Sequence, residues 1–173
     1  MASDVRTHQA LPARAGTRPR TTSEFPHAQL DQQPADDRHL DAILAEAATW
    51  PSVCRTGSGI SVEGARALAL EPSAANGPPE AFLVDPEFCH VHAGGDLSLH
   101  ATLPVPLAEE VVSAGWAEPH FLVHTGQAPA TVVLLYAPRD DHESDIVLGL
   151  VRASYMFARG PSTEDSGVLG PEG

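Results

Sequence analysis

Three histidines lie close together in the stretch FCHVHAGGDLSLH, residues 88–100, and they carry the chemistry that this sequence offers most clearly. They are His90, His92 and His100, and the odd-numbered positions around them are mostly apolar. Imidazole titrates near neutral pH, so the cluster can transfer protons, and three imidazoles are also enough to bind zinc or iron. The same alternation fits a third interpretation, the polar face of a half-buried hairpin whose imidazoles are hydrogen-bonded.

The length of the hairpin loop decides whether the three histidines share a face. Residues i and i+2 of a strand point the same way, so His90 and His92 lie together. A two-residue turn at Gly94-Gly95 puts His100 on the opposite face, whereas a loop of three or five residues puts it on the same face. Only the odd loop separates polar from apolar side chains, and we therefore expect it. The polar face then also carries Ser98 and Thr102.

Two other places combine polar and aromatic side chains. Trp116 and His120 follow a predicted helix, at the entry to a strand. Tyr136 and Arg139 lie in the stretch YAPRD, where a buried strand meets the last helix, and ligands often bind where loops leave a scaffold. Core packing explains Trp116 equally well, a hydrogen bond explains His120, and an ion pair with a nearby acid explains Arg139.

Charge and composition exclude several classes of partner. The net charge is −13, and residues 40–173 hold five arginines against eighteen acids. An acidic body repels phosphate backbones and anionic membranes, so we expect a small-molecule partner and neither nucleic acid nor membrane. The two cysteines, Cys54 and Cys89, lack metal-site spacing and are expected to be buried thiols. No dinucleotide motif, P-loop, nucleophile elbow or zinc-protease motif is present.

The elements that must position these side chains alternate between short strands and a few helices. Helices are predicted over 38–49, 105–114 and 140–159, the last with the capping-box form D-x-x-E. Strands are predicted at 53–62, 64–70, 81–84, 87–92, 97–103, 119–123 and 131–137. We therefore expect one α+β domain, an antiparallel sheet packed against two or three helices.

The ends of the chain are polar, proline-containing and aperiodic, so residues 1–36 and 160–173 are predicted to be disordered. No apolar run approaches the ~18 residues of a membrane span, and the N-terminus lacks the apolar core of a secretion signal. We expect a cytoplasmic protein.

The chain resembles the luciferase domain of fungal bioluminescence in motifs that occur in order and at matching spacing. These are EFCHVH (87–92), Leu99-His100, Gly115-Trp116, His120, LYAPR (135–139) and ASY (153–155). It is similar still more closely to small bacterial proteins of the luciferase family, over about residues 27–158. That similarity includes QLDQ (29–32), SVEGARALAL (61–70) and GPPEAF (77–82), so it extends the expected domain to 27–159 and shortens the N-terminal tail to 1–26.

The resemblance implies addition of O₂ to an enolic, pyrone-like small molecule without flavin or nicotinamide. It implies catalytic roles for His90, His92, His100, His120 and Arg139, with Arg139 holding the enolate charge, and substrate-binding roles for Trp116 and Tyr136. The family usually has His-Pro-Leu at the position of His120-Phe121-Leu122, so the local turn is expected to differ. No cofactor is expected, although a metal bound by His90, His92 and His100 stays open. A metal-binding protein and a non-catalytic binding module are the alternatives to an enzyme.

Overall fold

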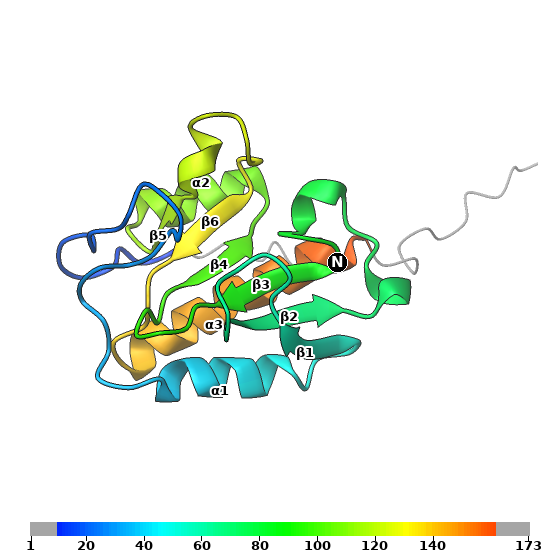
Figure 1. Ribbon diagram of the computed structural model, residues 1–173, viewed down its shortest axis with the longest axis horizontal. Helices are drawn as coiled ribbons and strands as arrows, with labels where there is room; N and C mark the ends of the chain where they lie inside the picture. Colours follow the sequence, from blue (N-terminus) through cyan, green and yellow to red (C-terminus); the bar gives the residue numbers. More distant parts are fainter. Residues whose placement is uncertain (1–9, 162–173) are drawn as a thin grey trace, which may run out of the picture.

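Six antiparallel strands form one sheet, in the spatial order β1-β2-β3-β4-β6-β5. The computed structural model describes residues 10–161, shown in Figure 1. The strands are β1 (Val53–Gly57), β2 (Arg66–Leu70), β3 (Glu87–Val91), β4 (Leu99–Thr102), β5 (Ala117–Pro119) and β6 (Val132–Leu135). The helices are α1 (Arg38–Ala47), α2 (Val105–Ser113) and α3 (Asp141–Arg159). The predicted α+β class, an antiparallel sheet with helices, is confirmed.

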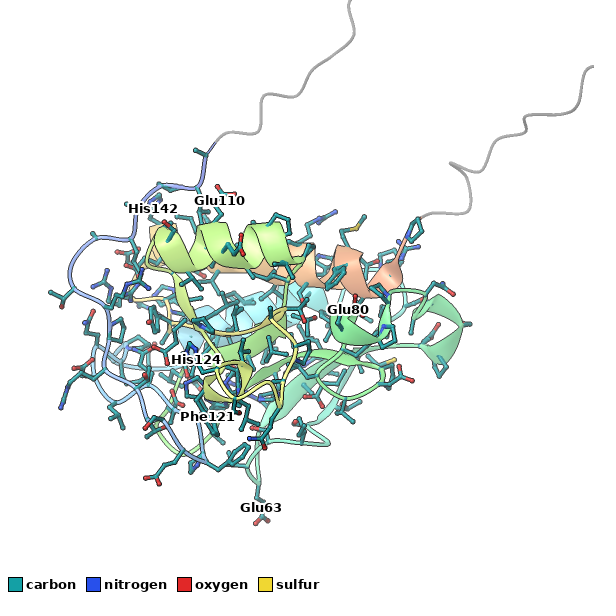
Figure 2. All side chains as sticks on the ribbon, turned by 90° about the horizontal axis from the view of Figure 1, so that it is seen from above. Glu63, Glu80, Glu110, Phe121, His124 and His142 are labelled. Carbon is teal, nitrogen blue, oxygen red and sulfur yellow. The ribbon has the colours of Figure 1, made fainter. Side chains whose placement is uncertain are left out.

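The helices cover one face of the sheet and build the apolar core. α1 packs against α3, and α3 lies along β3 and β4. Figure 2 shows α2 and α3 along one side of the molecule, with Phe121 and His124 toward the other. The apolar stripe of α1 is fully buried at Leu40, Ile43 and Leu44, as its helical spacing predicts. Within residues 10–161, no helix combines the length and the apolar character that crossing a membrane requires.

A side-chain hydrogen bond caps the N-terminus of helix α3. The Asp140 side chain accepts the Glu143 N–H at 2.8 Å, which is one half of the predicted capping box. The other half is absent, because the Glu143 carboxylate accepts the Arg139 N–H at 3.0 Å instead of returning to the cap. Gly160, with φ of 70°, ends the helix as expected.

The N-terminal segment, residues 10–33, is drawn in blue in Figure 1; it lies at the β5 and β6 end of the sheet and covers part of the opposite face at His27. Gln29 accepts the Ala137 N–H at 2.9 Å, and Gln33 accepts the Leu97 N–H at 2.9 Å. The sequence predicts a disordered tail up to residue 26, but residues 10–26 belong to this packed segment. Buried polar contacts, such as the ion pair between Arg14 and Glu143, fix this segment in place. Such contacts do not raise the hydropathy of a sequence, so the polar composition predicts disorder here. Residues 1–9 and 162–173 of the predicted tails lie outside the described residues.

Two predicted strands are not strands. Residues 81–84 follow Pro78-Pro79, whose fixed φ and missing N–H groups favour the short 3-10 helix Pro79–Ala81, and only Val84 forms an isolated bridge. Residues 121–123 form a second 3-10 helix, so β5 ends at Pro119.

Strand β6 is fully buried and has a strand on each side, as its continuous apolar run predicts. Cys89 is buried as predicted, whereas Cys54 is exposed because β1 is an edge strand.

Candidate active site

Five of the nine histidines gather beneath the N-terminal segment, on the sheet face away from the helices. They come from β3, the β3–β4 loop, β4, the end of β5 and the N-terminal segment, and all are at least 92% buried. They are His90, His92, His100, His120 and His27, and we call them the histidine cluster.

The hairpin has the odd loop that the alternation predicts. His90 pairs directly with His100 across β3 and β4, and the His92 N–H donates to the Ser98 carbonyl at 3.1 Å. The loop therefore contains residues 93–97, and three histidines share one face. Ser98 joins them, with its Oγ 3.1 Å from His92 Nδ1.

Thr102 does not join this face, contrary to expectation. Its hydroxyl donates to the Ala81 carbonyl at 2.7 Å and lies 3.3 Å from the Ser154 hydroxyl of α3. At the end of β4 these two partners satisfy the buried hydroxyl away from the imidazoles.

His100 is the centre of the cluster, because both of its ring nitrogens face other imidazoles. Its Nδ1 lies 3.2 Å from the Nε2 atoms of both His90 and His92. Its Nε2 lies 3.2 Å from Nδ1 of His27. The His120 ring packs beside it with the ring centroids 4.8 Å apart.

A carboxylate holds the outer nitrogen of three of these rings. Glu87 lies 2.6 Å from Nδ1 of His90, and Asp96 lies 2.6 Å from Nδ1 of His92. Glu118 lies 2.8 Å from Nε2 of His27. An ionised carboxylate only accepts hydrogen bonds, so each of these ring nitrogens carries a proton, and a neutral ring then presents the lone pair of its other nitrogen toward His100.

The three carboxylates stay ionised although they are partly or fully buried. Burial acts to raise the pKa of Glu87, but hydrogen bonds from His90, the Gly59 N–H and Ser58 outweigh it and lower that pKa. The pKa of Asp96 is likewise lowered, since hydrogen bonds from His92 and the Ser98 N–H exceed the effect of burial.

The pKa of Glu118 is lowered in the same way as those of Glu87 and Asp96. Burial acts to raise its pKa, but the hydrogen bond from His27 and further hydrogen bonds lower it overall. Acidic partners of this kind fix the orientation of the imidazoles that they contact.

The inner imidazoles are neutral. Burial, followed by the neighbouring histidines, holds the pKa of His100 well below its ordinary value. Burial lowers the pKa of His120 to about 4, and the other histidines add to the effect. His120 Nδ1 accepts the Leu122 N–H at 3.2 Å, so its neutral ring carries the proton on Nε2.

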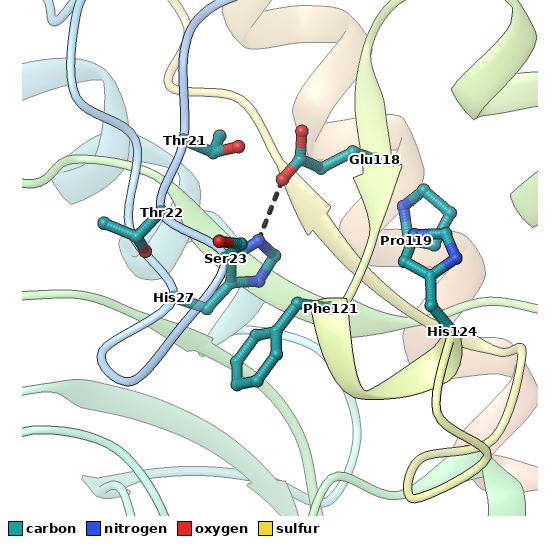
Figure 3. A pocket seen from close by; sticks show the side chains of 8 residues that line it. All are labelled: Thr21, Thr22, Ser23, His27, Glu118, Pro119, Phe121 and His124. Atoms are coloured by element: carbon teal, nitrogen blue, oxygen red, sulfur yellow. Dashed lines mark hydrogen bonds and ion pairs between the residues drawn. The ribbon is translucent and has the colours of Figure 1, made fainter.

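A cavity of about 180 Å³ adjoins the cluster between the N-terminal segment and the end of β5. Of the five clustered histidines, only His27 lines it. Figure 3 shows the Glu118 carboxylate reaching the His27 ring at this cavity. The other lining residues are Thr21, Thr22, Ser23, Pro119, Phe121 and His124. The His27–Glu118 pair is therefore the part of the cluster that a small molecule can approach.

The structure places three other predicted site residues away from the imidazoles. Trp116 is in the apolar core, where its indole N–H donates to the Pro12 carbonyl at 2.6 Å. Tyr136 is buried behind the cavity and donates to Glu118 at 3.1 Å, so it contacts the site only through that carboxylate.

Arg139 is not brought to the cluster. Its guanidinium binds Glu143, the Ala15 carbonyl and Gln32, which is the ion-pair alternative that its neighbours in sequence suggested. Its predicted role in holding an enolate has no support in these contacts.

Four polar residues of the site are not predicted from the sequence: His27, Glu87, Asp96 and Glu118. Glu118 lies two residues before His120, so strand alternation places both on one face, and Glu87 is the first residue of the EFCHVH motif. These two residues could therefore have been predicted from the sequence. His27 is 73 residues from its partner His100, and no local pattern links them.

Comparisons with known proteins find relatives of the part of the chain that contains most of this site. The family model described as Luciferase domain matches residues 85–154, which contain four of the five clustered histidines. The chain is similar to proteins named luciferase from Armillaria gallica (30% identical over 161 residues), Armillaria ostoyae (29% over 161) and Neonothopanus nambi (30% over 162). Each alignment covers 85% of this chain and 60% of the relative, so the chain spans only part of their length. No solved structure matches. The chain is therefore similar to the luciferase-domain family, through the domain matched at residues 85–154 and through about 30% identity to fungal proteins named luciferase.

Proposed function

We propose that the protein is an oxygenase-type enzyme that acts on a small enolic or aromatic, pyrone-like molecule through the histidine cluster. The observation that carries the proposal is the buried set of five imidazoles, three of them held by ionised carboxylates, with one such pair at a cavity. Groups of shifted pKa that converge beside a cavity are typical of catalytic sites. The name luciferase that the relatives carry is consistent with oxygen chemistry.

In this proposal the His27–Glu118 pair takes the proton of the substrate hydroxyl on the Glu118 carboxylate, since Nε2 of His27 already carries a proton and its Nδ1 faces His100. The enolate that remains donates an electron pair from carbon to O₂, so a carbon–oxygen bond forms and the negative charge passes to the outer oxygen of a peroxide. His90, His92, His100 and His120 lie behind the pair and fix its tautomer and position. The protein supplies the base, and O₂ is the oxidant.

The cavity sets a limit on the substrate. Its volume of about 180 Å³ is below the ~300–1,000 Å³ of pockets for drug-sized ligands. A single ring fits this space, and a larger molecule requires the Thr21–His27 segment to move. That segment pairs with residues 28–30 through the Thr21–Gln29 bridge and not with the six-stranded sheet, so it can shift together with them without breaking a strand pair of the sheet.

Oxygen uptake with a panel of hydroxylated α-pyrones and enolic phenols tests the proposal. We expect consumption by the purified protein and a loss of at least tenfold in the His90→Ala, His92→Ala double variant. His142→Gln, a change at an exposed histidine of α3, is the matched control and should keep the rate. Unchanged turnover in the double variant contradicts the assigned site, and binding of these compounds without oxygen uptake favours the non-catalytic alternative.

A further inference from the structure

We propose that Nε2 of His90, Nε2 of His92 and Nδ1 of His100 together bind one divalent transition-metal ion. These three side chains form a group whose candidate ligand atoms all lie within 4.8 Å of one another. The inference deepens the proposed function, and its catalytic meaning rests on that function. The binding itself does not depend on turnover.

The spacing of the nitrogens suits a metal. His100 Nδ1 lies 3.2 Å from Nε2 of His90 and 3.2 Å from Nε2 of His92. In a tetrahedral site with metal–nitrogen bonds of ~2.0–2.1 Å, ligand nitrogens lie about 3.3 Å apart. The Nε2 atoms of His90 and His92 lie within 4.8 Å of each other, so these two rings would draw together to accept an ion.

The proton count of the cluster gives the stronger reason. Glu87 and Asp96 hold the Nδ1 protons of His90 and His92, so both Nε2 lone pairs point at His100. Glu118 holds the Nε2 proton of His27, so a third lone pair, on Nδ1, points at the other side of His100.

A neutral His100 has only one N–H, which can point either toward His90 and His92 or toward His27. If its Nδ1 carries the proton, the Nε2 lone pair faces the lone pair of His27 at 3.2 Å. If its Nε2 carries the proton, three lone pairs converge on one point with no hydrogen between them. The second arrangement is unfavourable alone but is the ligand set of a cation, and a metal ion turns the repulsion into coordination.

With an ion bound, every ligand has an outer partner. His90 donates to Glu87 and His92 donates to Asp96, while His100 Nε2–H donates to His27. His27 in turn donates to Glu118. Metal-binding histidines nearly always have such outer acceptors, which fix the tautomer and increase the basicity of the ligand nitrogen.

A second group of three, His27, His100 and His120, fits less well. His120 Nδ1 accepts the Leu122 N–H, so its neutral ring keeps the proton on Nε2 and has no free lone pair to offer. His100 also cannot give both nitrogens to metals without losing its last proton. The two groups therefore compete for His100, and the tautomers favour the group on β3 and β4.

The donor set indicates the class of ion. Three neutral imidazoles without a carboxylate or thiolate suit Zn²⁺, Fe²⁺, Co²⁺ or Cu²⁺ and not Mg²⁺ or Ca²⁺. Among residues 10–161 the group contains three ligands, so one tetrahedral position remains for water. Three protein ligands with one open position are the arrangement of catalytic zinc sites.

Metal analysis of the full chain, purified without a histidine tag, tests the inference, followed by chelator treatment and titration with Co²⁺. We expect one ion per chain, visible absorption bands of four-coordinate Co²⁺, and a higher melting temperature of the loaded protein. The His90→Ala, His92→Ala variant should bind at least 100-fold more weakly. Asp96→Asn, which preserves size, should weaken binding about 10- to 100-fold, as loss of an outer partner does. His142→Ala should bind like wild type.

The inference is overturned if folded protein takes up none of Zn²⁺, Co²⁺, Fe²⁺ and Cu²⁺. It is also overturned if uptake is equal in the wild type, the double variant and Asp96→Asn, since the ion then binds elsewhere. Oxygen uptake tells the two proposals apart. Metal binding without oxygen uptake supports this inference and contradicts the proposed function, whereas uptake by protein that binds no metal does the reverse.

Discussion

At the scale of single residues, His100 determines what the cluster can do. Its two ring nitrogens face opposite neighbours, His27 on one side and the pair His90 and His92 on the other. Outside that ring, each facing imidazole is fixed by a carboxylate, so the cluster has few alternative proton arrangements. An ordinary polar hairpin face offers its histidines to solvent, and this arrangement instead directs lone pairs toward one buried point.

The tautomers of these rings can be measured directly. In metal-free protein at pH 7.5 we expect the Nδ1–H tautomer at His90 and His92, because each Nδ1 donates to an ionised carboxylate. Two-bond ¹H–¹⁵N spectra of histidine-labelled protein report the protonated nitrogen of each ring. In Glu87→Gln the neutral amide no longer imposes the Nδ1 proton, so only the His90 signals should change tautomer. Nε2–H at both rings in the wild type contradicts the proton count.

At the scale of the elements, α3 ties the two covered faces of the sheet together. Its first turn holds Arg139 and the buried Arg14 of the N-terminal segment through Glu143. Its last turn lies against the loop before the 3-10 helix Pro79–Ala81, where the Gly77 N–H donates to the Ala158 carbonyl at 2.8 Å. The helix therefore connects the core to the segment that covers the histidines.

The close approach at Gly77 predicts opposite effects for two glycine substitutions. A Cβ at Gly77 would lie 2.3 Å from the Phe157 carbonyl oxygen, so Gly77→Ala should lower the free energy of unfolding by about 1–3 kcal/mol. Gly149 lies on the exposed side of α3 with nothing within 4 Å of its Cβ position, so Gly149→Ala should raise it by about 0.5–1 kcal/mol. Urea denaturation measures both. Equal effects of the two substitutions would show that the contact at Gly77 is not close.

The ion pair at the start of α3 predicts a large cost for Glu143→Gln. The side chain of Arg14 is 2% exposed, so loss of the carboxylate leaves its charge buried without a counter-charge. Breaking a buried pair in this way costs about 3–5 kcal/mol, and the amide of glutamine recovers only part of the hydrogen bonding. Thermal unfolding against Glu109→Gln, a change at an exposed glutamate of α2, isolates the effect. A shift no larger than that of the control would contradict the role given to Glu143.

At the scale of the whole molecule, one sheet separates two different interiors. The helix side is mostly apolar, as in the contacts of Leu40, Leu68 and Leu99. The buried hydroxyls of Thr102 and Ser154 are hydrogen-bonded within it. The other side contains imidazoles and carboxylates under a segment of irregular backbone. The first interior stabilises the fold, and the second is the polar site that the fold supports.

The polar interior makes stability depend on pH. Burial, followed by the neighbouring histidines, lowers the pKa of His120 from its ordinary value of 6.5 to about 4. Between these two pH values the imidazole is protonated in the unfolded chain but neutral in the folded protein, so acidification favours unfolding. Stability from this group is complete above pH 6.5 and is lost as the pH falls through that window. The pKa of Glu143 is lowered because hydrogen bonds from Arg139 exceed the effect of burial, so its contribution is lost below about pH 4.

Urea midpoints of the metal-free protein between pH 8 and pH 3 test this dependence. We expect a decline that begins near pH 6.5 and steepens below pH 4. Glu143→Gln should flatten only the lower part of the curve, and His120→Asn only the upper part. Stability that rises on acidification from pH 7 to pH 5 would contradict the neutral, buried state of His120.

Local patterns in the sequence determined which side chains share a strand face or a helix face in this protein. The alternation in 88–100 predicts one shared face for three histidines, because a strand repeats every two residues and a slip would bury the wrong side chains. The apolar stripe of α1, the cap of α3 and the buried run of β6 are equally local properties. The motifs from EFCHVH to ASY are likewise local, and they carry the resemblance to the luciferase domain.

Only the tertiary structure decided which partners complete the site. His27 reaches His100 across 73 residues, and Glu118 reaches His27 across 91, and such contacts leave no periodic trace in a sequence. Arg139 is the opposite case. Its position in the LYAPR motif predicts a place in the site, but its guanidinium instead pairs with Glu143, one helical turn away. The sequence by itself determines which side chains share a strand face or a helix turn, since these follow from backbone geometry. Which faces meet depends on how the whole chain packs, and here that packing brings His27 and Glu118 to the hairpin and keeps Arg139 from it.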